Sequence, residues 1–232
     1  IEDIEVIQQL QEIEGIGKSS IYQKAEEMIY ISEEEQSDEL IALGGLESIV
    51  SNAKTENGFR VKAAIVILDD ASFLEYCFQN GIQESLNGTI ILNRIWDSAN
   101  SNFRYKQYVP FIKENIDSIT MFSNEQNGQS IEVPALGFTG EEAVLREEYD
   151  NYVLVHFVSV STWKNLIAQL GGAEADTYIR IFSKETPTIE SLSELEERVT
   201  LLVGQNYKIE SENRIQEKLS NNELMSGMTI IL

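Results

Sequence analysis

The most constraining feature of the sequence is a run of alternating strand and helix signals between residues 177 and 232. β-Branched and aromatic residues cluster over 178–182, which predicts a strand, and apolar residues recur with a 3.6-residue period over 189–203, which predicts a helix. A strand over 207–210 and a polar helix over 212–224 are expected to follow. Chains that alternate in this way fold into layers, with helices packed on a sheet.

An earlier segment has the same order of elements. The apolar residues of 59–68 predict a strand whose end is buried on both faces. A helix over 71–80, with Asp69 or Asp70 as its N-terminal cap, and a strand over 88–92 are expected next.

A second segment repeats this order, with a strand over 153–158 and a helix over 161–170 that Ser159 or Ser161 can cap. A shift of 90 residues superposes Asp69 on Ser159, Ser72 on Thr162, Phe73 on Trp163, Cys77 on Ile167 and Gly81 on Gly171. This agreement indicates a weak internal repeat, although two ordinary capped helices would agree nearly as well by chance.

The stretch between these two segments has a different pattern. Residues 118–122 and 130–138 alternate like strands on either side of the turn signal Asn127–Gly128. We therefore predict an α+β fold with two lobes. The main lobe is expected to comprise residues 1–93 and 151–232, and a strand-rich lobe over 94–150 is expected to be inserted into it.

The main lobe should also contain the N-terminal part of the chain. Residues 1–13 have the spacing of an amphipathic helix, and a strand is expected over 20–31. The helices over 71–80, 161–170 and 189–203 are expected to pack on one face of a shared sheet.

The charge balance limits the kinds of partner. The chain has 39 acidic and 17 basic residues, and its net charge is −22. Nucleic-acid binding requires clustered Lys and Arg and is therefore disfavoured. A cationic partner would be attracted, although solubility alone also explains an acidic surface.

No residue pattern identifies a reaction or a cofactor. A phosphate loop at 15–19 fails, because its first glycine would have to stand at Glu12 and a helix precedes it where a strand is needed. Cys77 is the only cysteine, which excludes an internal disulfide and a thiolate metal cluster. We therefore predict no metal and no cofactor.

The remaining reactive side chains favour structural roles. His156, the only histidine, lies within a strand, and Cys77 lies on the apolar face of a helix. The adjacent Asp69 and Asp70 stand at a helix start, where one can cap the helix and the other can interact with its dipole. We predict that the chain is not an enzyme, while a hydrolase using His156 or a pair of carboxylates stays open as an alternative.

Large aromatic side chains gather in the least regular part of the sequence, where loops often carry recognition. We predict that partner binding uses Trp96, Phe103, Tyr105 and Tyr108. Phe111 belongs to the same cluster. The alternative is that these aromatics form the small core of the inserted lobe.

Both ends of the sequence suggest a piece of a longer chain. It begins at Ile1 without a signal-peptide pattern, and it ends on the apolar run 228–232. We expect that this run could be the beginning of a membrane-spanning helix.

Together these features resemble the extracytoplasmic domain of bacterial ABC-transporter permeases of the MacB/FtsX-like family. The resemblance rests on the opening helix that ends at Glu14-Gly15-Ile16, the two strand–helix–strand segments and the closing run 178–232. In that run, residues 209–214 and the polar helix after them resemble the approach to the membrane. The similarity is greatest over 176–232 and weakest over 94–150.

The resemblance implies a domain on the extracellular side of a bacterial cell membrane, between two transmembrane helices of the same chain. It implies a separate cytoplasmic ATPase subunit, a peptide, antibiotic or lipid as substrate, and an intact transporter that could be a homodimer. It also implies a role in export, in recognition or in transmitting conformational change. A stand-alone secreted or surface-anchored binding module is the alternative.

Overall fold

The computed structural model describes residues 2–50, 53–96, 108–122, 129–140, 154–170, 175–185, 188–204, 208–212 and 227–231. The chain divides into two compact units. Unit 1 comprises Ile1–Gln23 and Asp176–Leu232, and unit 2 comprises Lys24–Ala175. Both units contain helices and strands, which confirms the predicted mixture of the two.

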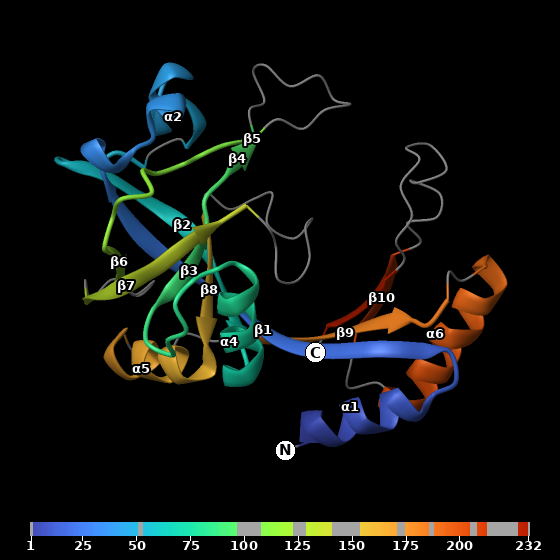
Figure 1. Ribbon diagram of the computed structural model, residues 1–232. Helices are drawn as coiled ribbons and strands as arrows, with labels where there is room; N and C mark the ends of the chain where they lie inside the picture. Colours follow the sequence, from blue (N-terminus) through green and yellow to red (C-terminus); the bar gives the residue numbers. More distant parts are fainter. Residues whose placement is uncertain are drawn as a thin grey trace. The chain divides into compact units, whose positions relative to one another are not determined.

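Unit 1 contains a four-stranded sheet in the order β10-β11-β9-β1 and two helices (Figure 1). Its elements are α1 (Glu2–Glu12), the first part of β1 (Ile16–Ser32), β9 (Asp176–Ser183), α6 (Ile189–Val203), β10 (Lys208–Glu212) and β11 (Gly227–Ile231). The helical period found in the sequence explains how α6 packs, since its buried side chains lie three to four residues apart. They form one core with residues of α1, β1 and β9: Leu10, Ile16, Ile179, Ile181, Leu192, Leu195, Val199 and Val203.

The ends of α6 follow local chemistry. The Thr188 side chain accepts a hydrogen bond from the Ser191 backbone N–H, as an N-cap does. Gly204 follows the last turn with φ +67°, a conformation that favours glycine.

The apolar run near the C-terminus is a strand. β11 lies between β10 and β9 and pairs antiparallel with both, so that Ile230 is paired with Ile209 and with Ile179. The expectation that 228–232 begins a membrane helix is therefore wrong for 228–231. Pairing with a strand on each side satisfies the backbone N–H and C=O groups that a helix would have satisfied internally. The polar helix predicted over 212–224 lies outside the described residues, apart from Glu212 in β10.

Unit 2 is a closed six-stranded barrel (Figure 1). Its strand order is β1-β2-β8-β3-β7-β6, and β6 pairs with β1 to close the ring. The strands after β1 are β2 (Gly58–Leu68), β3 (Thr89–Leu92), β6 (Ser118–Phe122), β7 (Ser130–Thr139) and β8 (Leu154–Ser159). β2 runs parallel to β8 and β3 parallel to β7, while β3–β8, β6–β7 and β1–β6 are antiparallel.

Shorter elements complete unit 2. They are η1 (Glu33–Glu35), α2 (Asp38–Ala42), α3 (Leu46–Ile49), α4 (Asp70–Gln79), α5 (Val160–Leu170) and a two-stranded sheet of β4 (Ile95–Trp96) and β5 (Tyr108–Val109). Helix α4 covers β8, where the Tyr76 and Phe157 rings meet edge to face at 5.1 Å.

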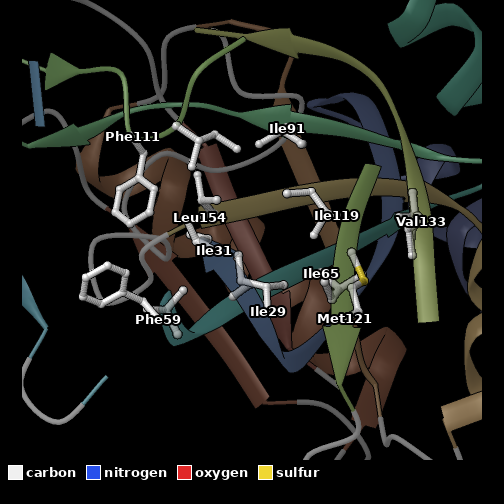
Figure 2. Close-up of a cluster of buried hydrophobic side chains, with 14 of the residues drawn as sticks. Ile29, Ile31, Phe59, Ile65, Ile91, Phe111, Ile119, Met121, Val133 and Leu154 are labelled. Carbon is white, nitrogen blue, oxygen red and sulfur yellow. The ribbon is translucent and has the colours of Figure 1, made fainter. Parts of the chain in front are cut away.

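The barrel core draws on every strand of the ring, as Figure 2 shows. Its members include Ile29, Ile31, Phe59, Ile65, Ile91, Phe111, Ile119, Met121, Val133 and Leu154. Register explains the arrangement, because paired residues point to the same face of a sheet. Ile29 is paired with Met121 across the closure between β1 and β6, and both are fully buried.

The unit boundaries differ from the predicted lobes. Strands β6 and β7 were assigned to an inserted lobe over 94–150, but they pair with β1 and β3 in the same barrel. Residues 1–23 and 176–231 were assigned to the same lobe as β2 and β8, yet they form unit 1. Thus α6 belongs to unit 1 whereas α4 and α5 belong to unit 2. The physical reason is that β6 and β7 bury Ile119, Met121 and Val133 only by joining the ring.

The two strand–helix segments of the predicted repeat have equivalent caps. Asp69 accepts a hydrogen bond from the Ser72 N–H at 2.9 Å, and the Ser159 hydroxyl accepts one from the Thr162 N–H at 2.9 Å. These are the positions that the shift of 90 residues superposes. Their strands, β2 and β8, lie side by side and parallel.

Candidate functional site: the base of the β4–β5 hairpin

The structure brings two of the four predicted recognition residues together. Trp96 of β4 is paired with Tyr108 of β5 in an antiparallel two-stranded sheet. Phe103 and Tyr105 lie outside the described residues. Phe111 is fully buried in the barrel core. For this aromatic residue the alternative prediction, a place in a hydrophobic core, therefore applies.

Asn93 joins the two sides of the hairpin at its base. It stands between β3 and β4, and its Oδ1 accepts hydrogen bonds from the backbone N–H groups of Phe111 and Ile112, both at 2.9 Å. Its Nδ2 donates to the carbonyl oxygen of Ile112 at 2.7 Å. A further contact from Nδ2 reaches Glu114 Oε1 at 3.5 Å. One side chain thus connects the residue before β4 with the residues after β5.

A second anchor holds the same returning segment. The Ser37 hydroxyl donates to the Pro110 carbonyl oxygen at 2.5 Å, and the Ser37 N–H donates to the Phe111 carbonyl oxygen at 3.1 Å. The same hydroxyl accepts a hydrogen bond from the Leu40 N–H and so caps α2. The segment after β5 is therefore fixed to the start of a helix as well as to the end of β3.

The end of β7 is attached at the same place. The Asn93 N–H donates to the Thr139 carbonyl oxygen at 3.2 Å, and Arg94 Nη1 donates to the Gly140 carbonyl oxygen at 2.8 Å. In the sheet, Leu92 is paired with Thr139 and with Val155. The ends of β3 and β7 and the start of β8 therefore share one end of the barrel, and the hairpin leaves from that end.

Sequence reasoning identified the aromatic residues of this site but missed Asn93 and Ser37. Their role depends on contacts to residues many positions away, and nothing in the local sequence distinguishes either residue from an ordinary loop asparagine or serine. The tertiary structure gives the site a fixed base on which a loop can be presented to a partner.

His156 lies in the barrel interior and not at an edge. It shares a strand face with Leu154 and Val158 of the core, is 0 % exposed, and is paired with Ile65 on β2 and Ile91 on β3. Its Nδ1 lies 3.3 Å from Thr89 Oγ1, while Nε2 has no hydrogen-bond partner among the described residues. Burial lowers the pKa of His156 to about 3, so the imidazole is neutral. Such a side chain offers a solvent-borne substrate no access, and the hydrolase alternative gains no support from it.

Cys77 and the aspartate pair have structural environments. Cys77 is fully buried, and burial raises the pKa of its thiol, which disfavours a reactive thiolate. Asp69 caps α4, whereas Asp70 accepts hydrogen bonds from the backbone N–H and the hydroxyl of Ser161, at 3.0 and 2.6 Å. The Ser161 hydrogen bonds lower the pKa of Asp70. Asp70 lies in the first turn of α4, where the helix dipole favours it as predicted, and its carboxylate also binds the start of α5, a contact that the sequence did not predict.

The other candidate sites show no arrangement of side chains that points to a ligand or a reaction, among the residues that the structure describes. Residues 16–19 of the rejected phosphate loop are part of β1, which begins at Ile16. A cavity of about 560 Å³ in unit 1 has both charge signs in its lining, with Lys184 and Arg198 beside Glu14, Glu185 and Glu194. Among the described residues, no group of three or more His, Cys, Asp or Glu side chains could hold a metal ion.

No protein-family model, curated protein or solved structure matches this chain. In the described part of the chain, no helix has both the length and the apolar character needed to cross a membrane.

Proposed function

We propose that this chain is the extracellular domain of a bacterial ABC-transporter permease of the MacB/FtsX-like type, and that its β4–β5 hairpin recognises a cationic peptide. The observation that carries the proposal is the fixed base of the hairpin, where Trp96 and Tyr108 are paired on a segment attached through Asn93 and Ser37. Aromatic side chains supply much of the binding energy at typical interfaces, and a fixed base lowers the entropy cost of presenting them.

Charge supports the choice of partner. The net charge of −22 would speed the approach of a cationic peptide, and the association rate would fall as salt rises. In this proposal the barrel, with its repeated strand–helix segments, is the scaffold, and the β4–β5 hairpin carries recognition. The domain works with the transmembrane part of its own chain and with a separate cytoplasmic ATPase. It catalyses no reaction itself.

The test uses the intact transporter and a fluorescein-labelled peptide of alternating lysine and leucine as the probe. We expect the combined replacement of Trp96, Tyr105 and Tyr108 by Ala to weaken peptide binding about tenfold or more in an anisotropy titration. Phe78→Ala is the matched control, since Phe78 is an aromatic side chain 74 % exposed on α4. Circular dichroism establishes that each variant is folded.

Equal affinity in the wild type and in the folded triple variant would refute recognition by the hairpin. A wild-type transporter that does not bind the probe would refute the choice of a cationic peptide. The location is tested by reading the full-length gene. Membrane segments on both sides and an adjacent ATPase gene are expected, and their absence would favour a stand-alone binding module.

A further inference from the structure

We infer that Asn93 is the positioning residue of the recognition hairpin: it touches no partner, yet binding depends on it. This inference rests on the proposed function, because it assigns a residue to the recognition site proposed above. It is carried by the juxtaposition of one buried amide side chain with both sides of the hairpin.

The hydrogen-bonding capacity of Asn93 is directed at the returning side of the hairpin. The residue is only 6 % exposed. Its oxygen accepts from two successive backbone N–H groups, Phe111 and Ile112, and its nitrogen donates to the Ile112 carbonyl oxygen and reaches the Glu114 carboxylate. An asparagine side chain has two acceptor lone pairs and two donor hydrogens. All four are used within one short segment, so no other polar side chain of similar size would fit without leaving a group unpaired.

The position of Asn93 in the chain makes these bonds a clamp. Asn93 lies two residues before β4, and Phe111 lies two residues after β5. The side chain therefore closes the hairpin at the point where both of its sides leave the barrel. Closing a loop removes alternative arrangements of its ends before any partner arrives.

The backbone of Asn93 is held by Thr139 at the end of β7, and a different group of Thr139 contacts the end of α4. The Asn93 N–H donates to the carbonyl oxygen of Thr139, whose hydroxyl donates to Asn80 Oδ1 at 2.7 Å. Asn80 Nδ2 in turn donates to the Tyr76 carbonyl oxygen at 2.9 Å. The Thr139 carbonyl that holds Asn93 is thus a different group from the Thr139 hydroxyl that binds Asn80.

Asn80 provides a matched control. It is also an asparagine with two side-chain hydrogen bonds, and these bonds join it to Tyr76 and Thr139, not to Phe111 or Ile112. Asn93→Ala leaves two buried N–H donors without acceptors, whereas Asn80→Ala leaves the bonds to Phe111 and Ile112 in place.

The first experiment measures amide hydrogen exchange by NMR on the 232-residue chain. Asn93→Ala is expected to accelerate exchange at Phe111 and Ile112 about tenfold relative to the Ile65 amide of β2, because both amides lose their acceptor. Asn80→Ala is expected to leave that ratio unchanged. Equal acceleration of all three amides would overturn the clamp, since it would mean only general destabilisation.

The second experiment repeats the peptide titration on the intact transporter. Asn93→Ala is expected to raise the Kd of the probe, and the increase in log Kd should be at least half of that caused by the triple aromatic variant. Asn80→Ala is expected to keep the Kd within about twofold of the wild-type value. Wild-type affinity in Asn93→Ala, together with weak binding by the triple variant, would overturn the positioning role alone. Wild-type affinity in the triple variant would refute the proposed function, and the role of Asn93 in recognition with it.

Discussion

Acid should destabilise this protein through the buried imidazole of His156. The folded protein holds the imidazole in the barrel interior, where burial lowers the pKa from the ordinary 6.5 to about 3. As the pH falls below 6.5, the unfolded chain takes up a proton that the folded chain does not, and stability falls. The neutral imidazole therefore leaves the free energy of unfolding at its full value above about pH 6.5, and this free energy falls progressively as the pH is lowered to about 3.

The size of the effect follows from the two pKa values. Their separation corresponds to a loss of about 5 kcal/mol at a pH below both values. Between about pH 7.5 and about pH 5.5, the same values give a loss of about 1 kcal/mol. Hydrogen bonds lower the pKa values of the Asp70 and Glu132 carboxyls, so these two groups stay ionised throughout this range, and comparison with a variant that lacks the histidine separates the effect of His156 from that of the other groups.

The assay is urea unfolding followed by tryptophan fluorescence. Both tryptophans, Trp96 and Trp163, belong to unit 2, which also contains His156. His156→Gln is the control, because glutamine can keep a bond to Thr89 but takes up no proton. The pH-dependent loss of unfolding free energy in the wild type should exceed that in His156→Gln by about 1 kcal/mol over the range given above.

A single histidine also allows a direct measurement. The C2 proton of His156 gives one histidine resonance, and it should not shift between about pH 7.5 and about pH 5.5 in the folded protein. A resonance that titrates near 6.5, or identical pH dependence in the wild type and the glutamine variant, would show that the imidazole is accessible to protons and refute the reasoning.

Two further predictions compare matched substitutions by urea unfolding. Phe73→Ala should cost about 3–5 kcal/mol because its ring is fully buried, whereas Phe78→Ala on the same helix should stay within about 0.5 kcal/mol because its ring is 74 % exposed. Similar costs would contradict the orientation of α4. Gly58→Ala should cost about 2 kcal/mol or more, since the added Cβ would clash with the Ile31 carbonyl oxygen, and Gly140→Ala should be nearly neutral, since nothing lies within 4 Å. A neutral Gly58→Ala would contradict the close approach of β1 and β2.

The sequence by itself determined the local elements, because short-range patterns control them. The 3.6-residue period over 189–203 predicted α6, and the helix has the same bounds in the structure. The apolar run at the end of 59–68 predicted a strand buried on both faces, which is the case for β2. The caps at Asp69 and Ser159 follow from the same local chemistry, since a side-chain oxygen at a helix start bonds the N–H three residues on.

The candidate site was predictable only in part. Its aromatic residues were visible as a cluster in an irregular stretch, but Phe111 could not be separated from them without knowing that it enters the barrel core. Asn93 and Ser37 carried no distinguishing pattern, because their importance comes from partners 18 and 73 residues away.

The tertiary structure alone decided how the elements combine. Closure of the barrel requires β1 to pair with β6, and the insertion of β11 between β10 and β9 brings together strands from distant parts of the chain. Many strands of similar composition could have made these pairings, so the choice among them depends on which arrangement buries all the apolar faces at once. The local propensity of a segment does not determine which strand it pairs with. For this reason the unit boundaries and the clamp at Asn93 are known only from the tertiary structure.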